Sequence, residues 1–184
     1  MAKIIALDLS KRSTGWAVWQ DGWDMPRYGS VQLGSEFTGD GQTYVKLHHV
    51  LRDLRMTICK FETLYFEEPI NPAQLTGHTN IDTLRVLSGL AAHALSYSYA
   101  MGVTAQAVNI MAWRKFFVGK MPRGTKSRDL KDYTIERCQQ YGWKPRTNDE
   151  ADALGILDYA IDMQGIRPPW REDETLRAPL GMRA

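Results

Sequence analysis

The chain of 184 residues is poor in cysteine and has no long hydrophobic run. Its two cysteines, Cys59 and Cys138, are far apart and provide neither a disulfide framework nor a close-spaced pair of metal ligands. No apolar run reaches the roughly 18 residues of a membrane-spanning helix. The short apolar run near the start is interrupted by Asp8 before it could form a signal-peptide core. These absences argue against a disulfide-stapled secreted domain and a membrane protein, and they favour the reducing cytoplasm.

Neither sign of charge dominates, since the formal net charge is only +2, but the charge is unevenly spread. Residues 114–146 carry ten Lys or Arg against three acids, a net charge of +7, which leaves −5 for the remainder. A basic block on a slightly acidic body suggests a polyanionic partner. On charge alone, a solvated helix face explains the block equally well.

The pattern of apolar residues predicts one α/β domain over residues 1–165, with 43% hydrophobic residues. Three strands with short turns between them come first, which predicts an antiparallel meander, and two further strands are separated by helices. This order predicts a mixed sheet with helices packed on it. Residues 166–184 are rich in proline and charge and are expected to be an extended or disordered tail. The strands are expected at residues 3–9, 16–20, 27–34, 63–68 and 103–108, and the helices at 41–60, 80–101, 111–117, 128–142 and 149–164, the last capped by Asn148.

Acidic residues stand at the ends of three of these elements. Asp8 continues the face of Ile4 and Ala6 on an apolar strand, where an ionised carboxylate is costly unless it is paired, solvated or bound to a metal. Glu67 and Glu68 end another strand.

Asp149 and Asp152 add a third acidic position, at the start of the last helix. They are three residues apart and so share one face of a helix whose remainder is largely apolar. Each acid taken singly has an ordinary explanation, since acids favour the first turn of a helix and strand ends are often solvated. The joint pattern raises the possibility of a shared site.

These residues resemble the RuvC-type Holliday junction resolvases of the RNase H-like superfamily. The segment IIALDLSKRSTGWAV is similar to the family's opening strand, which ends in Asp before a Ser/Thr-Gly turn. YFEEP is similar to its strand carrying Glu, DEADALGI to its Asp-x-x-Asp-Ala-Leu helix, and FVGKMPRGTKS to its Val-Gly loop followed by Lys-Ser. The resemblance spans residues 3–162 with the motifs in the family's order. It implies a mixed five-stranded sheet with helices on both faces.

The resemblance also implies the chemistry of metal-dependent hydrolysis of a phosphodiester. Asp8, Glu67, Asp149 and Asp152 are then the catalytic carboxylates and would bind two Mg²⁺ ions, or Mn²⁺ in their place. Carboxylate oxygens suit such hard cations, and a pair of them about 4 Å apart can activate a water and stabilise the leaving 3′-oxygen. Neighbouring strand residues face opposite ways, so only one of Glu67 and Glu68 is expected to enter the site. The choice of Glu67 rests on the resemblance.

The family further implies binding of four-way or branched DNA by a homodimer. The basic segment would contact DNA phosphates through Arg114, Lys115, Lys120, Arg123, Lys126 and Arg128. Either Arg114 or Lys115 could be the family's basic residue before the loop glycine. An aromatic wedge that follows the Glu in some members is replaced here by Ile70.

The apolar residues of the helix at 80–101 are the expected dimer interface. They are Ile81, Leu84, Leu87, Leu90, Ala91, Ala94 and Leu95. A simpler explanation is that this stripe only covers the sheet.

Three other functions remain open from the sequence. An RNase H-like nuclease could act on RNA–DNA hybrids or flaps. The opening segment also resembles the phosphate turn of actin-like ATPases, although the chain is about half the length of that two-lobed fold. A DNA-binding module without catalysis is disfavoured, because clustered acids repel phosphate. Trp113 and Phe116 could be core residues or base-stacking residues, while His48, His49, His78 and His93 lack ligand spacing with the acids.

Overall fold

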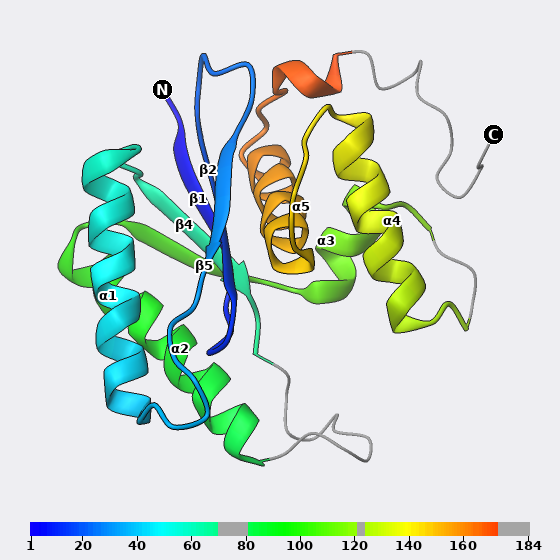
Figure 1. Cartoon of the computed structure of the whole chain (residues 1–184). Helices are drawn as coiled ribbons and strands as arrows, with labels where there is room; N and C mark the ends of the chain where they lie inside the picture. Colours follow the sequence, from blue (N-terminus) through cyan, green and yellow to red (C-terminus); the bar gives the residue numbers. More distant parts are fainter. Residues whose placement is uncertain (70–80, 121–123, 173–184) are drawn as a thin grey trace.

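The protein is built on a five-stranded mixed sheet. Figure 1 shows helices on both faces of this sheet. The computed structural model describes residues 1–69, 81–120 and 124–172. The strands, in the order β3-β2-β1-β4-β5 across the sheet, are β1 (Lys3–Asp8), β2 (Thr14–Gln20), β3 (Arg27–Val31), β4 (Thr63–Glu67) and β5 (Thr104–Val108). The helices are α1 (Asp40–Thr57), α2 (Ile81–Ala100), α3 (Ile110–Phe117), α4 (Ser127–Gln140), α5 (Asn148–Met163) and the short 3-10 helix η2 (Pro169–Arg171).

The strand directions match the predicted mixture. β1, β2 and β3 pair in antiparallel fashion, while β4 pairs in parallel with both β1 and β5. The chain enters β4 from α1 and enters β5 from α2, since parallel strands need such crossover connections. The predicted α/β fold with a mixed sheet is therefore confirmed.

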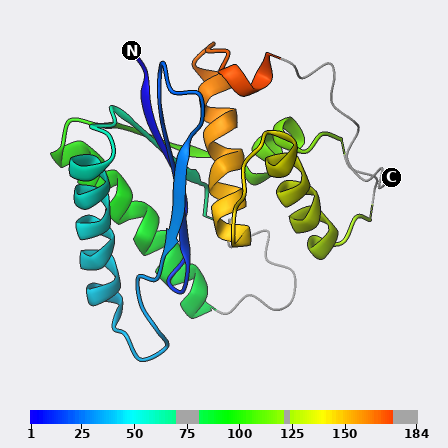
Figure 2. The ribbon, with the colours of Figure 1, turned by 45° about the horizontal axis from the view of Figure 1, so that its top comes forward.

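Two hydrophobic cores lie on opposite faces of the sheet, and alternation along β1 assigns its side chains to them. Ile5 and Leu7 pack with α1 and α2, whereas Ile4 and Ala6 pack with α3, α4 and α5. The turned view in Figure 2 separates these two helical layers. Because both faces are covered, β1 is apolar on both sides up to Asp8.

The carboxyl ends of β1 and β4 lie at one edge of the sheet because the two strands are parallel and adjacent. The first turn of α5 lies at the same end of the molecule (Figure 1). Three chain segments that are distant in sequence therefore meet there. Among the described residues, no helix is long and apolar enough to cross a membrane.

The start of α5 differs from the prediction by one residue. The N-cap is Thr147, whose side-chain oxygen accepts a hydrogen bond from the amide of Glu150, and Asn148 is already helical. Thr and Asn both cap helices well, so the sequence does not decide which of the neighbouring residues Thr147 and Asn148 is the N-cap.

Within the stretch expected to be an extended or disordered tail, residues Pro169–Arg171 instead form the helix η2. Trp170 is buried, and its indole N–H donates to Oδ1 of Asp158 on α5 at 2.8 Å. Arg171 donates to the same carboxylate, 3.0 Å from Nε to Oδ1. The core thus continues through η2 because Asp158, fully buried, requires these partners. Residues 173–184 lie outside the described part.

Candidate active site

Three elements bring the four predicted carboxylates to one end of the sheet. Asp8 is the last residue of β1, Glu67 is the last of β4, and Asp149 and Asp152 occupy the first turns of α5. Alternation places Asp8 on the α5 side of the sheet with Ile4 and Ala6.

The same alternation separates Glu67 from Glu68. Tyr65, two residues before Glu67, belongs to the core beneath α5, so Glu67 faces α5 as well. Glu68 lies beyond the end of the strand with an exposed side chain, and its amide donates to the carbonyl of Val108. Of the two, only Glu67 lies on the face that carries Asp8.

Gly15 allows α5 to approach the end of β1. It pairs with Asp8 across the antiparallel register, and a Cβ added to it would lie 1.9 Å from the carbonyl oxygen of Asp149. Any side chain at this position would therefore push the first turn of α5 away from Asp8. The sequence marks Gly15 only as a turn residue, whereas its main role is this close contact between two elements.

A second contact fixes the same turn of α5 from the other side. Glu150 is buried, and its carboxylate accepts hydrogen bonds from the hydroxyl of Ser30 at 3.1 Å and from the amide of Arg146 at 2.7 Å. These bonds connect α5 to β3 and to the segment that precedes the helix. Asp149 and Asp152, on either side of Glu150, are consequently held in place by a residue that does not face the site.

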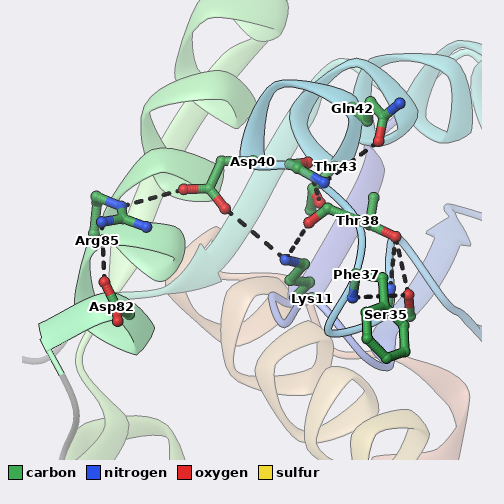
Figure 3. Close-up of polar contacts among 10 residues, drawn as sticks. Lys11, Ser35, Phe37, Thr38, Asp40, Gln42, Thr43, Asp82 and Arg85 are labelled. Atoms are coloured by element: carbon green, nitrogen blue, oxygen red, sulfur yellow. Dashed lines mark hydrogen bonds and ion pairs between the residues drawn. The ribbon is translucent and has the colours of Figure 1, made fainter.

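The loop after Asp8 is braced by a polar network, drawn in Figure 3. The ammonium group of Lys11 donates to the carbonyl of Thr38 and lies 3.9 Å from Oδ1 of Asp40. Arg85 of α2 pairs with both Asp40 and Asp82, at 3.2 Å and 3.0 Å. The network connects this loop to the starts of α1 and α2, so the chain leaving Asp8 is anchored to the opposite helical layer.

The four carboxylates interact electrostatically. Burial raises the pKa of Asp8 well above its usual range, and the charges of Asp152, Glu67 and Asp149 raise it further. Burial likewise raises the pKa of Glu67 and of Asp152. The cluster thus concentrates negative charge that its surroundings solvate poorly, which is the condition that a bound cation relieves.

Helix α3 provides partners for two of the carboxylates. The indole N–H of Trp113 donates to Oε2 of Glu67 at 3.1 Å, and Nη2 of Arg114 lies 3.3 Å from Oδ2 of Asp152. Trp113 is fully buried and packs on Gly155 of α5, where an added Cβ would lie 2.7 Å from its ring. Trp113 is therefore a core residue that also orients Glu67, a role that its apolar surroundings in the sequence did not reveal.

Oxygen ligands of this kind suit Mg²⁺ or Mn²⁺, and four carboxylates can hold such ions. In the side-chain positions observed, however, no group of three or more His, Cys, Asp or Glu among the described residues is arranged to hold a metal ion. Glu67 and Asp152 are directed towards Trp113 and Arg114 instead. The donor set fits a hard divalent cation in its chemistry, and Asp8 lacks a positively charged partner within ion-pair distance in the described part of the chain.

Of the predicted DNA-binding residues that the structure describes, Arg114 alone contacts the carboxylates. Lys115, Lys120, Lys126 and Arg128 are exposed and form no ion pair within the described ranges. Lys131 on α4, which the sequence prediction omitted, is also exposed, and its charge lowers the pKa of Asp152, against the larger effect of burial. Arg123, Ile70 and His78 lie outside the described residues.

The remaining aromatic and histidine predictions concern packing. Phe116 is half-buried and lies 5.5 Å from the ring of Tyr159, with the guanidinium of Arg171 over its own ring. Nε2 of His48 lies 3.1 Å from Nδ1 of His93, between α1 and α2. That contact is on the sheet face opposite to the carboxylates, as expected for structural histidines.

No protein-family model and no curated protein matches the sequence. Solved structures do match. A Thermus thermophilus RuvC in complex with a Holliday junction has a TM-score of 0.62 at 16% identity, covering 90% of this chain and 97% of that chain. The fold is that of the RuvC-type resolvases. The yeast mitochondrial Holliday junction resolvase Ydc2 has a TM-score of 0.62 at 10% identity, covering 95% of this chain and 82% of its own. The fowlpox virus Holliday junction resolvase has a TM-score of 0.55 at 10% identity, over 88% of this chain and 99% of its own.

Proposed function

We propose that the protein is a metal-dependent, structure-selective endonuclease that resolves four-way DNA junctions by hydrolysis of phosphodiester bonds. The observation that carries the proposal is the electrostatic cluster of Asp8, Glu67, Asp149 and Asp152 at the end of a resolvase-type sheet. Structures of two of the similar folds contain junction DNA, namely those of the Thermus and fowlpox virus proteins. The activity proposed is that of a crossover junction endodeoxyribonuclease. The cytoplasm is the location expected from the sequence.

In this proposal the four carboxylates hold two Mg²⁺ ions, with Mn²⁺ able to replace them. Bound there, the ions supply the activation of a water and the stabilisation of the leaving 3′-oxygen. The residues of the chain do the positioning. Trp113 orients Glu67 through its indole N–H, Gly15 lets α5 bring Asp149 and Asp152 to Asp8, and the apolar core behind them excludes water.

DNA binding is assigned to the basic segment on α3, α4 and the chain between them. Exposed lysines and arginines such as Lys120, Lys126 and Arg128 are available for phosphate contacts, which provide affinity and orientation but little sequence reading. Since α3 also contacts the carboxylates, one helix connects this basic surface with the proposed catalytic site. Two protomers related by a two-fold axis would cut the two strands of one junction.

The test uses labelled four-way junction, Y-fork, duplex and RNA–DNA hybrid, each with Mg²⁺ or EDTA. We expect the junction to be cut in Mg²⁺ alone, and cutting to be lost in Asp8→Asn and Glu67→Gln while junction binding persists. Glu68→Gln is the matched control and should cut normally, because its side chain is exposed beyond the strand. Undiminished cutting by Asp8→Asn would contradict the metal site, and preferential cutting of the hybrid or the fork would assign a different substrate to the same fold.

A further inference from the structure

Arg114 lies inside the carboxylate cluster as its internal cation. Its Nη2 is 3.3 Å from Oδ2 of Asp152, and the two side chains are only 23% and 10% exposed. Burial is the main cause of the raised pKa of Asp8 and of Glu67, and the charge of Arg114 opposes that rise in both. The guanidinium therefore neutralises part of the charge that a divalent cation would neutralise.

The hydrogen bond between the guanidinium and Asp152 is weak for an ion pair that is largely buried. Charge-assisted N–H···O bonds are usually about 2.7–2.9 Å long, and arginine often binds a carboxylate with two parallel bonds. Here the bond to Asp152 is longer and single, and within the described part of the chain Nε is buried without a hydrogen-bond partner. The group also lies 5.0 Å from the centroid of the Trp113 ring, which is a cation–π contact.

Displacement of Arg114 from Asp152 would break one long hydrogen bond and give up the attraction of its charge to the carboxylates, which a divalent ion bound there would replace. A divalent ion on the same carboxylate would repel the guanidinium strongly, because both charges would lie in a poorly solvated site. Lys115, the next residue, is exposed and makes no such contact. The two basic residues that the sequence could not distinguish thus have different positions relative to the carboxylates.

We propose that Arg114 is a displaceable counter-ion that competes with the metal for Asp152, and that its release makes its guanidinium available to a DNA phosphate. The inference rests on the proposed function, because it needs a metal at the carboxylates and DNA at the site. By thermodynamic reciprocity, DNA that engages Arg114 tightens metal binding, and metal that displaces it tightens DNA binding. The enzyme would thereby favour a fully loaded site over one that holds metal alone.

The first experiment measures Mn²⁺ binding to the full chain by titration calorimetry without DNA. Arg114→Gln should bind Mn²⁺ about tenfold more tightly than the wild type, since it lacks the competing charge. Lys115→Gln removes the same charge one residue away and should match the wild type. Equal or weaker Mn²⁺ binding by Arg114→Gln, in protein whose thermal unfolding remains cooperative, would overturn the proposal.

The second experiment measures the coupling between metal and DNA, and its wild-type arm does not depend on the folding of a variant. Ca²⁺ replaces Mn²⁺ because its looser coordination supports little hydrolysis. Junction DNA should tighten Ca²⁺ binding to the wild type, and the factor should be smaller in Arg114→Gln. A junction that leaves the Ca²⁺ affinity of the wild type unchanged, or an equal factor in both proteins, would refute the coupling.

Failure of the inference can be told from failure of the proposed function. If the wild type binds Mn²⁺ and cuts junctions while Arg114→Gln binds Mn²⁺ with wild-type affinity, only the counter-ion role of Arg114 falls. If the wild type neither binds Mn²⁺ nor cuts any junction, the proposed function falls and the inference falls with it.

Discussion

At the scale of single residues, the carboxylate of Asp8 lowers the stability of the folded state, although the proposed site requires it. Burial and three neighbouring acids raise its pKa well above the usual range. A carboxyl with a higher pKa in the folded state stabilises the fold below its unfolded pKa, and that stabilisation is lost as the pH rises through the folded-state pKa. Without metal at neutral or alkaline pH, an ionised Asp8 is therefore a net cost to stability.

Asp8→Asn should for this reason raise the thermal midpoint in EDTA at about pH 8 by several degrees. The gain should shrink as the pH falls towards about 4, because the wild-type carboxyl then becomes protonated as well. Scanning calorimetry at a series of pH values measures this, with the exposed Asp21→Asn as the control. A gain that does not depend on pH would show that the charge of Asp8 is not the cause.

Gly15 is the second residue on which the site depends. Gly15→Ala should destabilise the protein by about 1–3 kcal/mol, as overpacking does, and should reduce cleavage more than stability alone explains. The reason is that the new methyl would meet the carbonyl of Asp149 and shift α5 away from Asp8. Gly41→Ala is the control, because an added Cβ at Gly41 in α1 meets no atom within 4 Å. Denaturant unfolding and junction cleavage, measured on both variants, test the prediction.

At the scale of elements, the sequence predicted the order and type of the strands and helices because period and turn residues agree locally. β1 and α5 lie within one or two residues of their predicted bounds. What it could not predict depends on contacts across the fold. The orientation of Glu67 follows from the core in which Tyr65 packs. The hydrogen bond from Trp113 to Glu67 follows from the contact between α3 and β4. Glycine is needed at position 15 because α5, more than 130 positions later in the chain, approaches it closely.

The end of the folded domain is another property that local pattern could not reveal. Arg171 and Trp170 stand in a proline-rich, charged stretch, yet both bind the fully buried carboxylate of Asp158. Removing one partner of a buried ion pair costs about 3–5 kcal/mol. Arg171→Ala should therefore lower the free energy of unfolding by about that amount, whereas Glu172→Ala, at an exposed neighbouring position, should have little effect. Urea unfolding distinguishes the two, and equal effects would mean that η2 is not held by this pair.

At the scale of the whole molecule, α2 has two apolar faces and only one of them is available to a partner. Leu84, Leu90, Ala91 and Ala94 are buried, and the last three pack in the core between α2 and the sheet. The predicted interface is therefore wrong for these residues, since charge placed there would damage the core. The outer face instead carries Ile81, Leu95 and Tyr99, which are 78%, 47% and 92% exposed, with the exposed Ser88 and Ala92 between them.

These outer residues recur at helical spacing and form one stripe, which we expect to be the face of a two-fold dimer. Small residues in the middle of such a stripe allow two helices to approach closely, and an isologous contact lets the stripe meet its own copy.

Light scattering should give the mass of a dimer for the wild type, alone and with junction DNA. Leu95→Asp should give a folded monomer that nicks strands independently and loses paired incision. Met56→Asp, which introduces the same charge at an exposed position on α1, should remain dimeric. A wild type that stays one protomer per junction at every working concentration would exclude paired incision within one complex, and the two cuts would then have to be made in separate binding events.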